Sequence, residues 1–262
     1  MVSHRSFNIL GNVAVVNFSD GTKSSDKKKF AQEILHKNGG IKTVLEKSGK
    51  FSGRLRKMKT KYLAGEKNKE VLYKENNCTF RFNLDTTYFS PRLSNERKEI
   101  TSFIKKDSTV LVMFAGVGPF SIVIAKNSKP KEVYSNEINR EANNYAKLNV
   151  QLNGVKNKIN FVNGDIKKVA PKLKEDSKKF DFIVMPRPNL KESFLEQAFM
   201  LSKKGTKIFY YDFCKVDETE SVVNKIKQQA KKSKKKIKIL KIKPAGETAP
   251  YKIRLRVDLE VL

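Results

Sequence analysis

The chain has 262 residues, of which 39% are hydrophobic, and its 55 lysines and arginines against 27 acidic residues give a net charge of +28. This hydrophobic content supports a folded core in one domain or two, and no apolar run approaches the ~18 residues that a membrane-spanning helix needs. The positive charge predicts a polyanionic partner that is released as salt rises. A general preference for lysine, set by genome or growth temperature, is the alternative explanation.

The first third of the sequence predicts a small α+β domain. Residues 7–18, FNILGNVAVVNF, indicate a β-hairpin or strand pair. Residues 24–40, SSDKKKFAQEILHKNGG, begin with capping residues, repeat apolar residues on one face and end in Gly-Gly, which is typical of a helix. Strand-like segments interrupted by glycines and by Asn76-Asn77 follow. We therefore expect one domain at residues 1–88 and a second at residues 89–262.

After a helical segment at residues 90–104, strands and helices alternate from residue 108. Five strand segments each precede a helical stretch: TVLVMFA, EVYSNEI, KINFVNGD, FDFIVMP and KIFYYDF. The helices after the last two are predicted at KESFLEQAFMLSKKG and TESVVNKIKQQAKK. This series predicts a parallel sheet with helices on both faces. Two closing strands, KIKILKIK and YKIRLRVDLEVL, with Gly246 and Pro250 between them, predict the antiparallel pair that ends a class I methyltransferase (Rossmann-like) fold.

Three successive strand ends carry residues suited to binding a nucleoside. Gly116 and Gly118 follow the first strand and let a ligand approach the backbone beyond the sheet. Glu137 ends the second strand, where a carboxylate can accept from ribose hydroxyls, and Asp165 ends the third. Each is also explained as a tight turn or a helix cap, but together they predict an adenosine-containing cofactor. The turn lacks the third glycine of a dinucleotide fingerprint, which fits S-adenosylmethionine because that cofactor has no pyrophosphate.

Several longer motifs resemble the archaeal and eukaryotic tRNA (guanine-37-N1)-methyltransferases. They are YFSPRLSNERKEI, VMFAGVGPFSI, SFNILGNVAVV, GRLRKMKTKYLAGEKN and APYKIRLRVDLEV, so that the resemblance covers almost the whole chain. It implies a cytoplasmic enzyme that methylates N1 of guanosine 37 in tRNA with S-adenosylmethionine, without a metal or an obligatory protein partner. Residues 1–88 would contribute to tRNA binding and to the active-site cleft. By the same resemblance, we expect the chain to lack the extra N-terminal module that many archaeal members carry before these motifs.

The resemblance also implies roles for individual residues. The base that removes the N1 proton would be Glu96, in SPRLSNER, and the catalytic arginine, nine residues before the glycine of LAGE, would be Arg56. Cofactor contacts are implied at Tyr88, Arg97, Phe114, Ala115, Gly116, Gly118, Glu137, Ile138, Asp165, Ile166 and Pro186. Substrate contacts are implied at Arg92, Arg97, Pro186 and Arg187.

Two positions depart from the common family pattern. Val112 stands where members usually have aspartate, and no role is assigned to it. The usual Asn-Leu-Pro after the fourth strand is Pro186-Arg187-Pro188 here, which resembles an archaeal branch linked to wyosine synthesis. Members of that branch can also methylate carbon 7 of the tricyclic base 4-demethylwyosine, and Glu137 in place of aspartate fits the same branch. Neutral drift in a turn is the alternative.

Two other functions remain open from the sequence. One is the aminocarboxypropyl transfer of wyosine synthesis on the same fold, and the other is a non-catalytic tRNA-binding protein. The lysine-dense residues 230–243 are a candidate phosphate-tracking surface, with a solvated helix end and a lysine-protected edge strand as the alternative. Cys78 and Cys214 are expected to be buried thiols in a reducing compartment.

Overall fold

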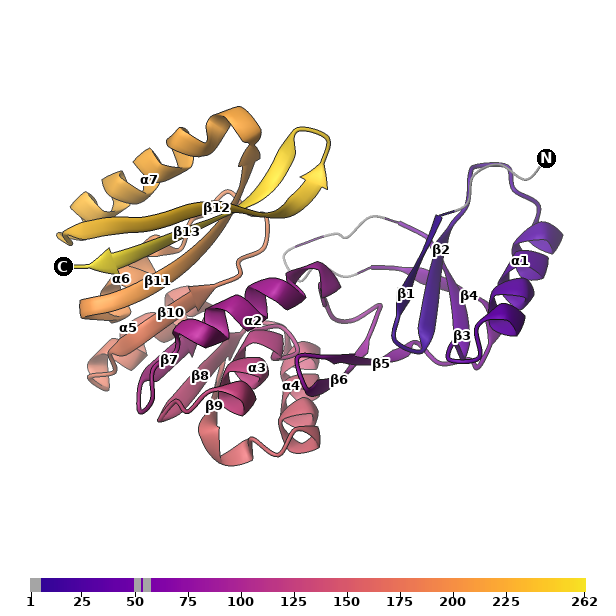
Figure 1. Cartoon of the computed structure of the whole chain (residues 1–262), viewed down its shortest axis with the longest axis horizontal. Coiled ribbons are helices and arrows are strands. Elements are labelled where there is room, and N and C mark those ends of the chain that lie inside the picture. Colours follow the sequence, from indigo (N-terminus) through magenta and orange to yellow (C-terminus); the bar gives the residue numbers. More distant parts are fainter. Residues whose placement is uncertain (1–5, 50–52, 54–57) are drawn as a thin grey trace.

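The computed structural model describes residues 6–49, 53 and 58–262, which form two sheets and a separate hairpin (Figure 1). The first sheet has the order β1-β2-β3-β4. Its strands are β1 (Ser6–Leu10), β2 (Val13–Asn17), β3 (Thr43–Lys47) and β4 (Thr60–Gly65). Helix α1 (Ser24–Lys37) packs on β3 and β4. The hairpin predicted at residues 7–18 and the helix predicted after it are both confirmed.

The second sheet has seven strands in the order β12-β13-β11-β10-β7-β8-β9. Its strands are β7 (Thr109–Val112), β8 (Glu132–Glu137), β9 (Ile159–Asn163), β10 (Phe180–Met185), β11 (Ser202–Lys215), β12 (Ile237–Ala249) and β13 (Lys252–Val261). The helices are α2 (Ser94–Phe103), α3 (Pro119–Asn127), α4 (Arg140–Leu152), α5 (Ile166–Glu175), α6 (Leu195–Leu201) and α7 (Thr219–Lys232). Strands β7 to β11 run parallel and β13 pairs antiparallel with β11 and β12, which confirms the predicted class I methyltransferase architecture.

Two predicted boundaries are wrong. The helix predicted at KESFLEQAFMLSKKG ends at Leu201, and the SKKG segment already belongs to β11. The Thr206 hydroxyl donates to the Phe180 carbonyl at 2.6 Å and accepts from the Lys203 amide at 2.8 Å, so this segment is held beside β10 and cannot continue the helix. Strand β12 also runs past Gly246, because β13 offers it a pairing partner as far as Ala249.

The hairpin of β5 (Glu70–Glu75) and β6 (Cys78–Asn83) is attached to helix α4 by asparagine side chains. The Asn149 side chain accepts from the Arg81 amide at 2.7 Å and donates to its carbonyl at 3.0 Å. Asn153 does the same with Thr79, at 2.9 and 2.7 Å. These amides take the place of a neighbouring strand and satisfy backbone groups at the outer edge of β6. The hairpin is thereby fixed to the second sheet.

The other strand of this hairpin contacts the first sheet. The Leu72 amide donates to the Asn12 side chain at 2.7 Å, and a Cβ atom at Gly11 would lie 1.9 Å from the Leu72 carbonyl oxygen. Glycine is therefore required at position 11, where φ is also +54°. The hairpin thus links the two sheets, between the small sheet and α4 in Figure 1. The domain boundary at residues 88 and 89 stays a prediction.

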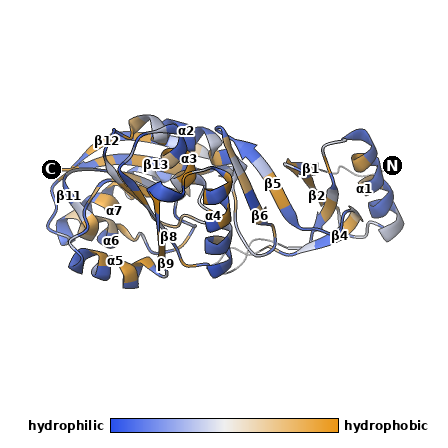
Figure 2. Ribbon diagram, turned by 90° about the horizontal axis from the view of Figure 1, so that it is seen from below, coloured by the Kyte–Doolittle hydropathy of each residue, from blue (hydrophilic) through white to orange (hydrophobic). Residues whose placement is uncertain are grey.

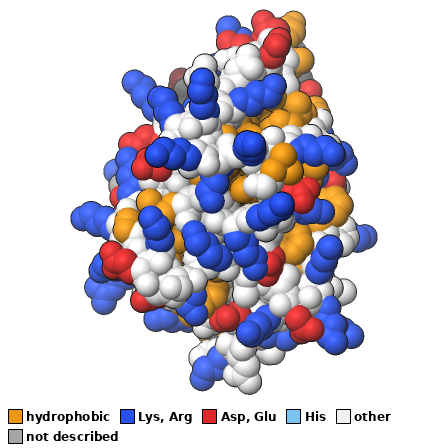
Figure 3. Space-filling view, turned by 90° about the vertical axis from the view of Figure 1, so that its left-hand side faces the viewer, with side chains coloured by type: hydrophobic (Ala, Val, Ile, Leu, Met, Phe, Trp, Pro, Cys, Tyr) orange, Lys and Arg blue, Asp and Glu red, His pale blue; other side chains and the backbone are white. Residues whose placement is uncertain are grey.

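Hydrophobic residues, orange in the ribbon of Figure 2, are frequent on the strands of both sheets, and the buried core clusters include residues of these strands and of the helices packed on them. Cys78 and Cys214 are both buried and free, as predicted. Lysines and arginines are spread over the end of the molecule that points away from the small sheet, with fewer acidic residues among them (Figure 3). Within the described ranges, no helix has the length and apolar character needed to cross a membrane.

Candidate active site

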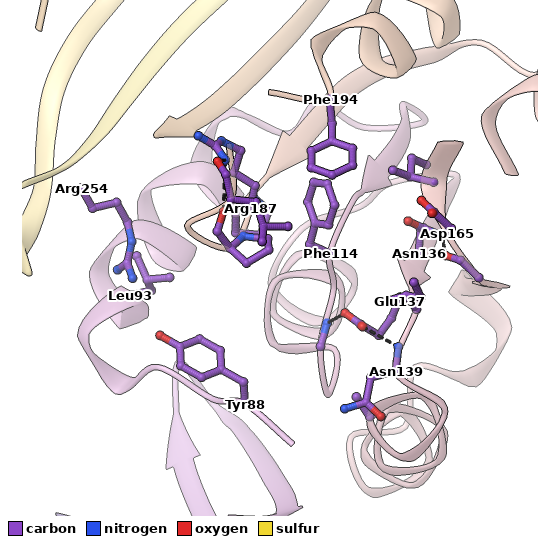
Figure 4. Close-up of a pocket in the computed structure, with 18 residues that line it drawn as sticks. Tyr88, Leu93, Phe114, Asn136, Glu137, Asn139, Asp165, Arg187, Phe194 and Arg254 are labelled. Carbon is purple, nitrogen blue, oxygen red and sulfur yellow. Dashed lines mark hydrogen bonds between the residues drawn. The ribbon is translucent and has the colours of Figure 1, made fainter. Parts of the chain in front are cut away.

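A pocket lies at the carboxyl ends of β7, β8, β9 and β10, where the loops after these strands meet. Its lining residues are Tyr88, Leu93, Phe114, Gly116, Asn136, Glu137, Ile138, Asn139, Ala142, Gly164, Asp165, Ile166, Pro186, Arg187, Pro188, Leu190, Phe194 and Arg254. Figure 4 shows Tyr88, Leu93 and Arg254 at one end and Asn136, Glu137 and Asp165 at the other. The parallel sheet therefore gathers residues that are far apart in the sequence at its ligand-binding edge.

The loop after β7 is shaped by left-handed backbone conformations. Phe114, Gly116 and Gly118 have φ values of 59°, 58° and 87°. Gly118 directly precedes α3, so this turn reverses the chain within a few residues. Gly116 and Phe114 line the pocket, whereas the buried Ala115 and Gly118 belong to the turn behind it. The loop thus presents the Gly116 backbone to the pocket, whereas Ala115 and Gly118, which were also predicted as cofactor contacts, lie outside its lining.

Glu137 binds this loop through its carboxylate. One oxygen accepts from the Gly116 amide at 2.8 Å and the other from the Asn139 amide at 2.7 Å (Figure 4). Burial raises the pKa of Glu137 above its usual value, although the hydrogen bonds from the Asn139, Gly116 and Ile138 amides oppose this shift. The carboxylate is therefore positioned at the pocket wall before any ligand arrives.

Further predicted cofactor contacts line the pocket near the end of β9 and in the loop after β7. Asp165 caps α5 by accepting from the Lys167 amide at 3.1 Å, and it lines the pocket together with Ile138 and Ile166. Phe114 packs edge-on against Phe194, with ring centroids 5.0 Å apart. The β9 end of the pocket therefore combines apolar surface with a few polar groups, a composition typical of small-molecule sites.

The loop after β10 is held by the buried side chain of Arg187. Its Nη1 donates to the carbonyls of Pro188, Leu190 and Glu192, at 3.1, 2.9 and 3.1 Å. Its Nη2 pairs with the Asp212 carboxylate. These contacts set the shape of the pocket wall that Pro186, Pro188 and Leu190 form.

Glu96 lies in a separate ionic network. Its Oε2 accepts from Tyr211 Oη at 2.8 Å and from Arg256 Nη1 at 2.7 Å, and its Oε1 lies 2.9 Å from Lys243 Nζ. Glu96 is outside the group of described residues that line the pocket. Leu93 and Arg254 do line it, three and two residues before Glu96 and Arg256 respectively. The network therefore adjoins that end of the pocket.

The three predicted arginines outside the pocket loops have different positions. Arg97 is buried and pairs with Glu75, so it belongs to a different ionic contact from its neighbour Glu96. Arg92 is exposed on the short 3₁₀ helix before α2. Arg56 lies outside the described residues. The structure thus brings Tyr88, Glu137, Asp165, Pro186 and Arg187 together and leaves Arg92 and Arg97 apart from them.

Sequence reasoning missed several pocket residues. They are Leu93, Asn136, Asn139, Ala142, Gly164, Pro188, Leu190, Phe194 and Arg254. Asn139 could have been found, because asparagine just before a helix is a frequent cap and its side chain does accept from the Glu141 amide at 3.0 Å. Arg254 sits in an alternating strand, where the sequence carries no signal of a ligand.

Comparison with known proteins identifies the family. The TRM5/TYW2 methyltransferase domain matches residues 71–240, and the TYW2 N-terminal domain matches residues 2–68. The tRNA (guanine(37)-N(1))-methyltransferase Trm5b of Pyrococcus abyssi is 31% identical over 257 residues, covering 98% of this chain and 74% of its own length. The tRNA (guanine(37)-N(1))/4-demethylwyosine(37)-methyltransferase Taw22 of Nanoarchaeum equitans is 31% identical over 304 residues, covering 98% of this chain and all of its own.

A solved structure agrees with these relatives. The crystal structure of Methanocaldococcus jannaschii Trm5 in complex with adenosine has a TM-score of 0.81 and 26% sequence identity. The match covers 98% of this chain and 74% of that one. The first sheet lies within the first matched segment, residues 2–68. Apart from Glu70, the linking hairpin lies within the second segment, residues 71–240, as do strands β7 to β11. The closing strands β12 and β13 extend beyond that segment. The chain therefore belongs to the TRM5/TYW2 methyltransferase family.

Proposed function

We propose that the protein transfers a methyl group from S-adenosylmethionine to N1 of guanosine 37 in tRNA, in the cytoplasm. The observation that carries this proposal is the carboxylate of Glu137, held at the end of β8 against the glycine turn in a chain of this family. Two relatives are named as methyltransferases of guanine 37 in tRNA, and these names support the choice of substrate. The net charge of +28 supports a polyanionic partner.

The pocket residues fit S-adenosylmethionine. Glu137 can accept hydrogen bonds from the ribose hydroxyls, and the apolar side chains of Ile138 and Ile166 offer surface for the adenine. Tyr88 lies at the opposite end, where the methionine part would extend (Figure 4). When bound, the cofactor supplies an electrophilic methyl group on its sulfonium. The protein has to bring the target nitrogen to that group and remove its proton.

Guanine N1 is protonated at neutral pH and is a poor nucleophile. In our proposal the Glu96 carboxylate accepts this proton, a form of catalysis typically worth about 10²–10⁴ in rate. Negative charge then spreads to O6, where Arg56 would stabilise it, worth about 10²–10³ by analogy with oxyanion donors. Base 37 has to leave the anticodon stack to reach the pocket, because its reacting edge is otherwise covered.

The decisive experiment is mass spectrometry of nucleosides from unmodified tRNA incubated with the protein and labelled S-adenosylmethionine. We expect 1-methylguanosine at position 37. A larger product carrying the aminocarboxypropyl group would replace our proposal by the transferase of wyosine synthesis. If the protein binds both tRNA and S-adenosylmethionine but modifies neither this base nor another, it is a binding protein and the proposal fails.

Replacing Glu137 by alanine is expected to weaken S-adenosylmethionine binding by about 1.5–3 kcal/mol, the usual contribution of hydrogen bonds to a charged group. The ribose would lose its acceptor, and the Gly116 and Asn139 amides would lose theirs. Calorimetry measures the effect. Glu132→Ala is the matched control, because Glu132 begins the same strand and contacts Asn160 at the surface. Equal affinities for Glu137→Ala and the parent would show that this strand end does not hold the ribose.

We also propose a second activity, methylation of carbon 7 of 4-demethylwyosine at the same tRNA position. The loop Pro186-Arg187-Pro188 supports it, because Pro186 places an apolar side chain in the pocket wall where the common family pattern has asparagine. The relative Taw22, whose name includes 4-demethylwyosine, supports it as well.

Changing Pro186 to asparagine is expected to shift the enzyme toward guanine N1 and away from the tricyclic base. One added hydrogen bond nets about 0.5–1.5 kcal/mol, or roughly 2–13-fold in the ratio of rates. Parent and variant are assayed on unmodified tRNA and on tRNA that carries the tricyclic base. A parent without activity on the tricyclic substrate would remove the second activity, and an unchanged ratio would show that Pro186 is not the selector.

A further inference from the structure

Glu96 lies over a row of side chains that crosses three neighbouring strands. Tyr211 of β11 is paired with Arg256 of β13, and Arg256 is paired with Lys243 of β12. All three members of this row contact the Glu96 carboxylate, Tyr211 and Arg256 at one oxygen and Lys243 at the other. The antiparallel ending of the sheet therefore builds the surroundings of the proposed base.

The row belongs to a larger cluster of opposite charges. Arg256 also donates to Glu99 at 2.7 Å and to Asp258 at 2.8 and 3.0 Å. Lys243 bridges Glu96 and Glu99, and Lys241 reaches Glu99 at 3.3 Å. The charged groups around Glu96 thus come from three elements. Glu99 lies on the same helix, Lys241 and Lys243 lie on β12, and Arg256 and Asp258 lie on β13. The Tyr211 hydroxyl of β11 completes the surroundings.

The two cations nearest Glu96 differ in burial. The Arg256 side chain is fully buried, with 0% exposure, and is fixed by three carboxylates. The Lys243 side chain is 25% exposed and stands on the edge strand of the sheet. Arg256 therefore lies at the buried centre of the cluster, while Lys243 lies at its partly exposed edge.

We propose that Lys243 is a positioning residue that keeps the Glu96 carboxylate ionised and oriented to take the guanine N1 proton. This inference rests on the proposed function, in which Glu96 is the base. Without Lys243, three carboxylates would share Arg256, with Lys241 at the rim on Glu99. Burying an unpaired carboxylate is costly, so one of the three would take up a proton.

Lys243 would have a second effect during the proton transfer itself, because its contact with Glu99 remains when Glu96 becomes neutral. The N1 proton would become bound to Glu96 Oε1, and the electron pair that held it would stay on guanine N1 and form the new bond to the methyl group. The bond between that methyl group and the sulfonium sulfur would break, and its electron pair would stay on the sulfur. Glu96 thereby becomes neutral, while Lys243 keeps its contact with Glu99. The cluster loses one negative charge without leaving a cation unpaired.

The cluster lowers the pKa of Glu96 and Glu99, whereas burial raises the pKa of Asp258, the third carboxylate on Arg256. Burial by itself would raise the pKa of Glu96, but hydrogen bonds from Lys243, Tyr211 and Arg256 outweigh it and bring the pKa below its usual value. For Glu99 the hydrogen bond from Arg256 is the largest influence, and its pKa falls to about 2. Removing Lys243 takes away the strongest of the bonds that lower the pKa of Glu96, so the pKa rises.

The test is the pH profile of the single-turnover methylation rate at saturating tRNA and S-adenosylmethionine. In Lys243→Met the rise of the rate with pH should move to higher pH, because the Glu96 carboxyl group loses its proton only at a higher pH. The midpoint of that rise should move up by about 1–3 pH units, as expected when one opposite charge within ~4–6 Å is lost, so the rate relative to the parent falls more at the acidic end of the profile than at pH 8.5. A role limited to folding or tRNA affinity would lower both rates by the same factor.

Two further variants keep this test decisive. Lys243→Arg retains a cation and should restore the position of the parent profile. Lys241→Met is the matched control, because Lys241 lies on the same strand and contacts Glu99 at 3.3 Å. Its profile should keep the position of the parent profile.

A Lys243→Met profile that coincides with the parent profile after scaling would overturn the inference, and so would an equal shift in Lys241→Met. If Lys243→Met does not fold, Lys243→Arg and Lys243→Gln are compared in its place, and coincident profiles of those two would overturn it. Failure of the proposed function is recognised separately, because the parent protein would then form no 1-methylguanosine at any pH.

Discussion

Replacing Glu96 by glutamine is expected to lower methyl transfer at pH 7 by at least about 10², because the side chain keeps its size and loses its capacity to accept a proton. Cofactor binding should survive, since the described residues that line the pocket do not include Glu96. Single-turnover rates on unmodified tRNA and the dissociation constant of S-adenosylmethionine measure the two effects independently.

Glu99→Gln is the matched comparison for this variant. Glu99 lies one turn further along α2 and shares Arg256 and Lys243 with Glu96. If loss of a carboxylate from the cluster were responsible for the slower reaction, both variants would be equally slow. Near-normal turnover of Glu96→Gln would rule out Glu96 as the base and direct attention to another group near Leu93 and Arg254.

Replacing Arg97 by methionine is expected to destabilise the fold by about 3–5 kcal/mol, the usual cost of removing one partner of a buried ion pair. The side chains of Arg97 and Glu75 are 1% and 4% exposed, and Arg97 Nη2 donates to Glu75 at 2.7 Å and to the Ser90 carbonyl at 3.0 Å. The guanidinium also lies 5.2 and 5.6 Å from the ring centroids of Phe89 and Phe120. Its loss would leave the Glu75 carboxylate buried without a cation.

Urea denaturation of Arg97→Met measures this cost. The double variant Arg97→Met, Glu75→Gln should recover part of the stability, because the stranded charge is removed as well. The family resemblance implies contacts of Arg97 with cofactor and substrate. Measuring the affinity of the folded Arg97→Met variant for S-adenosylmethionine tests the cofactor contact. A loss of stability below ~1 kcal/mol together with a large loss of S-adenosylmethionine affinity would favour a direct contact over the structural role.

The sequence predicted the features that depend on neighbouring residues. The alternation of strands and helices after residue 108, the hairpin at residues 7–18 and the closing antiparallel pair are all confirmed. The glycine turn at residues 114–118 and Glu137 were found because residues at successive strand ends lie together in any parallel sheet. The end of α6 was missed, since the Thr206 contact with β10 that fixes it is not local.

Sequence by itself determined the order of elements, the position of the ligand edge and the membership of a family with a recognisable set of motifs. The tertiary structure decided which charges meet. Glu96 and Arg256 are 160 residues apart in the chain, and Arg187 in the loop after β10 meets Asp212 of the neighbouring strand β11. The neighbouring residues Glu96 and Arg97 enter two different networks. Periodicity reports which face a residue occupies, whereas its partner depends on strand order and register, which are settled when the whole sheet forms.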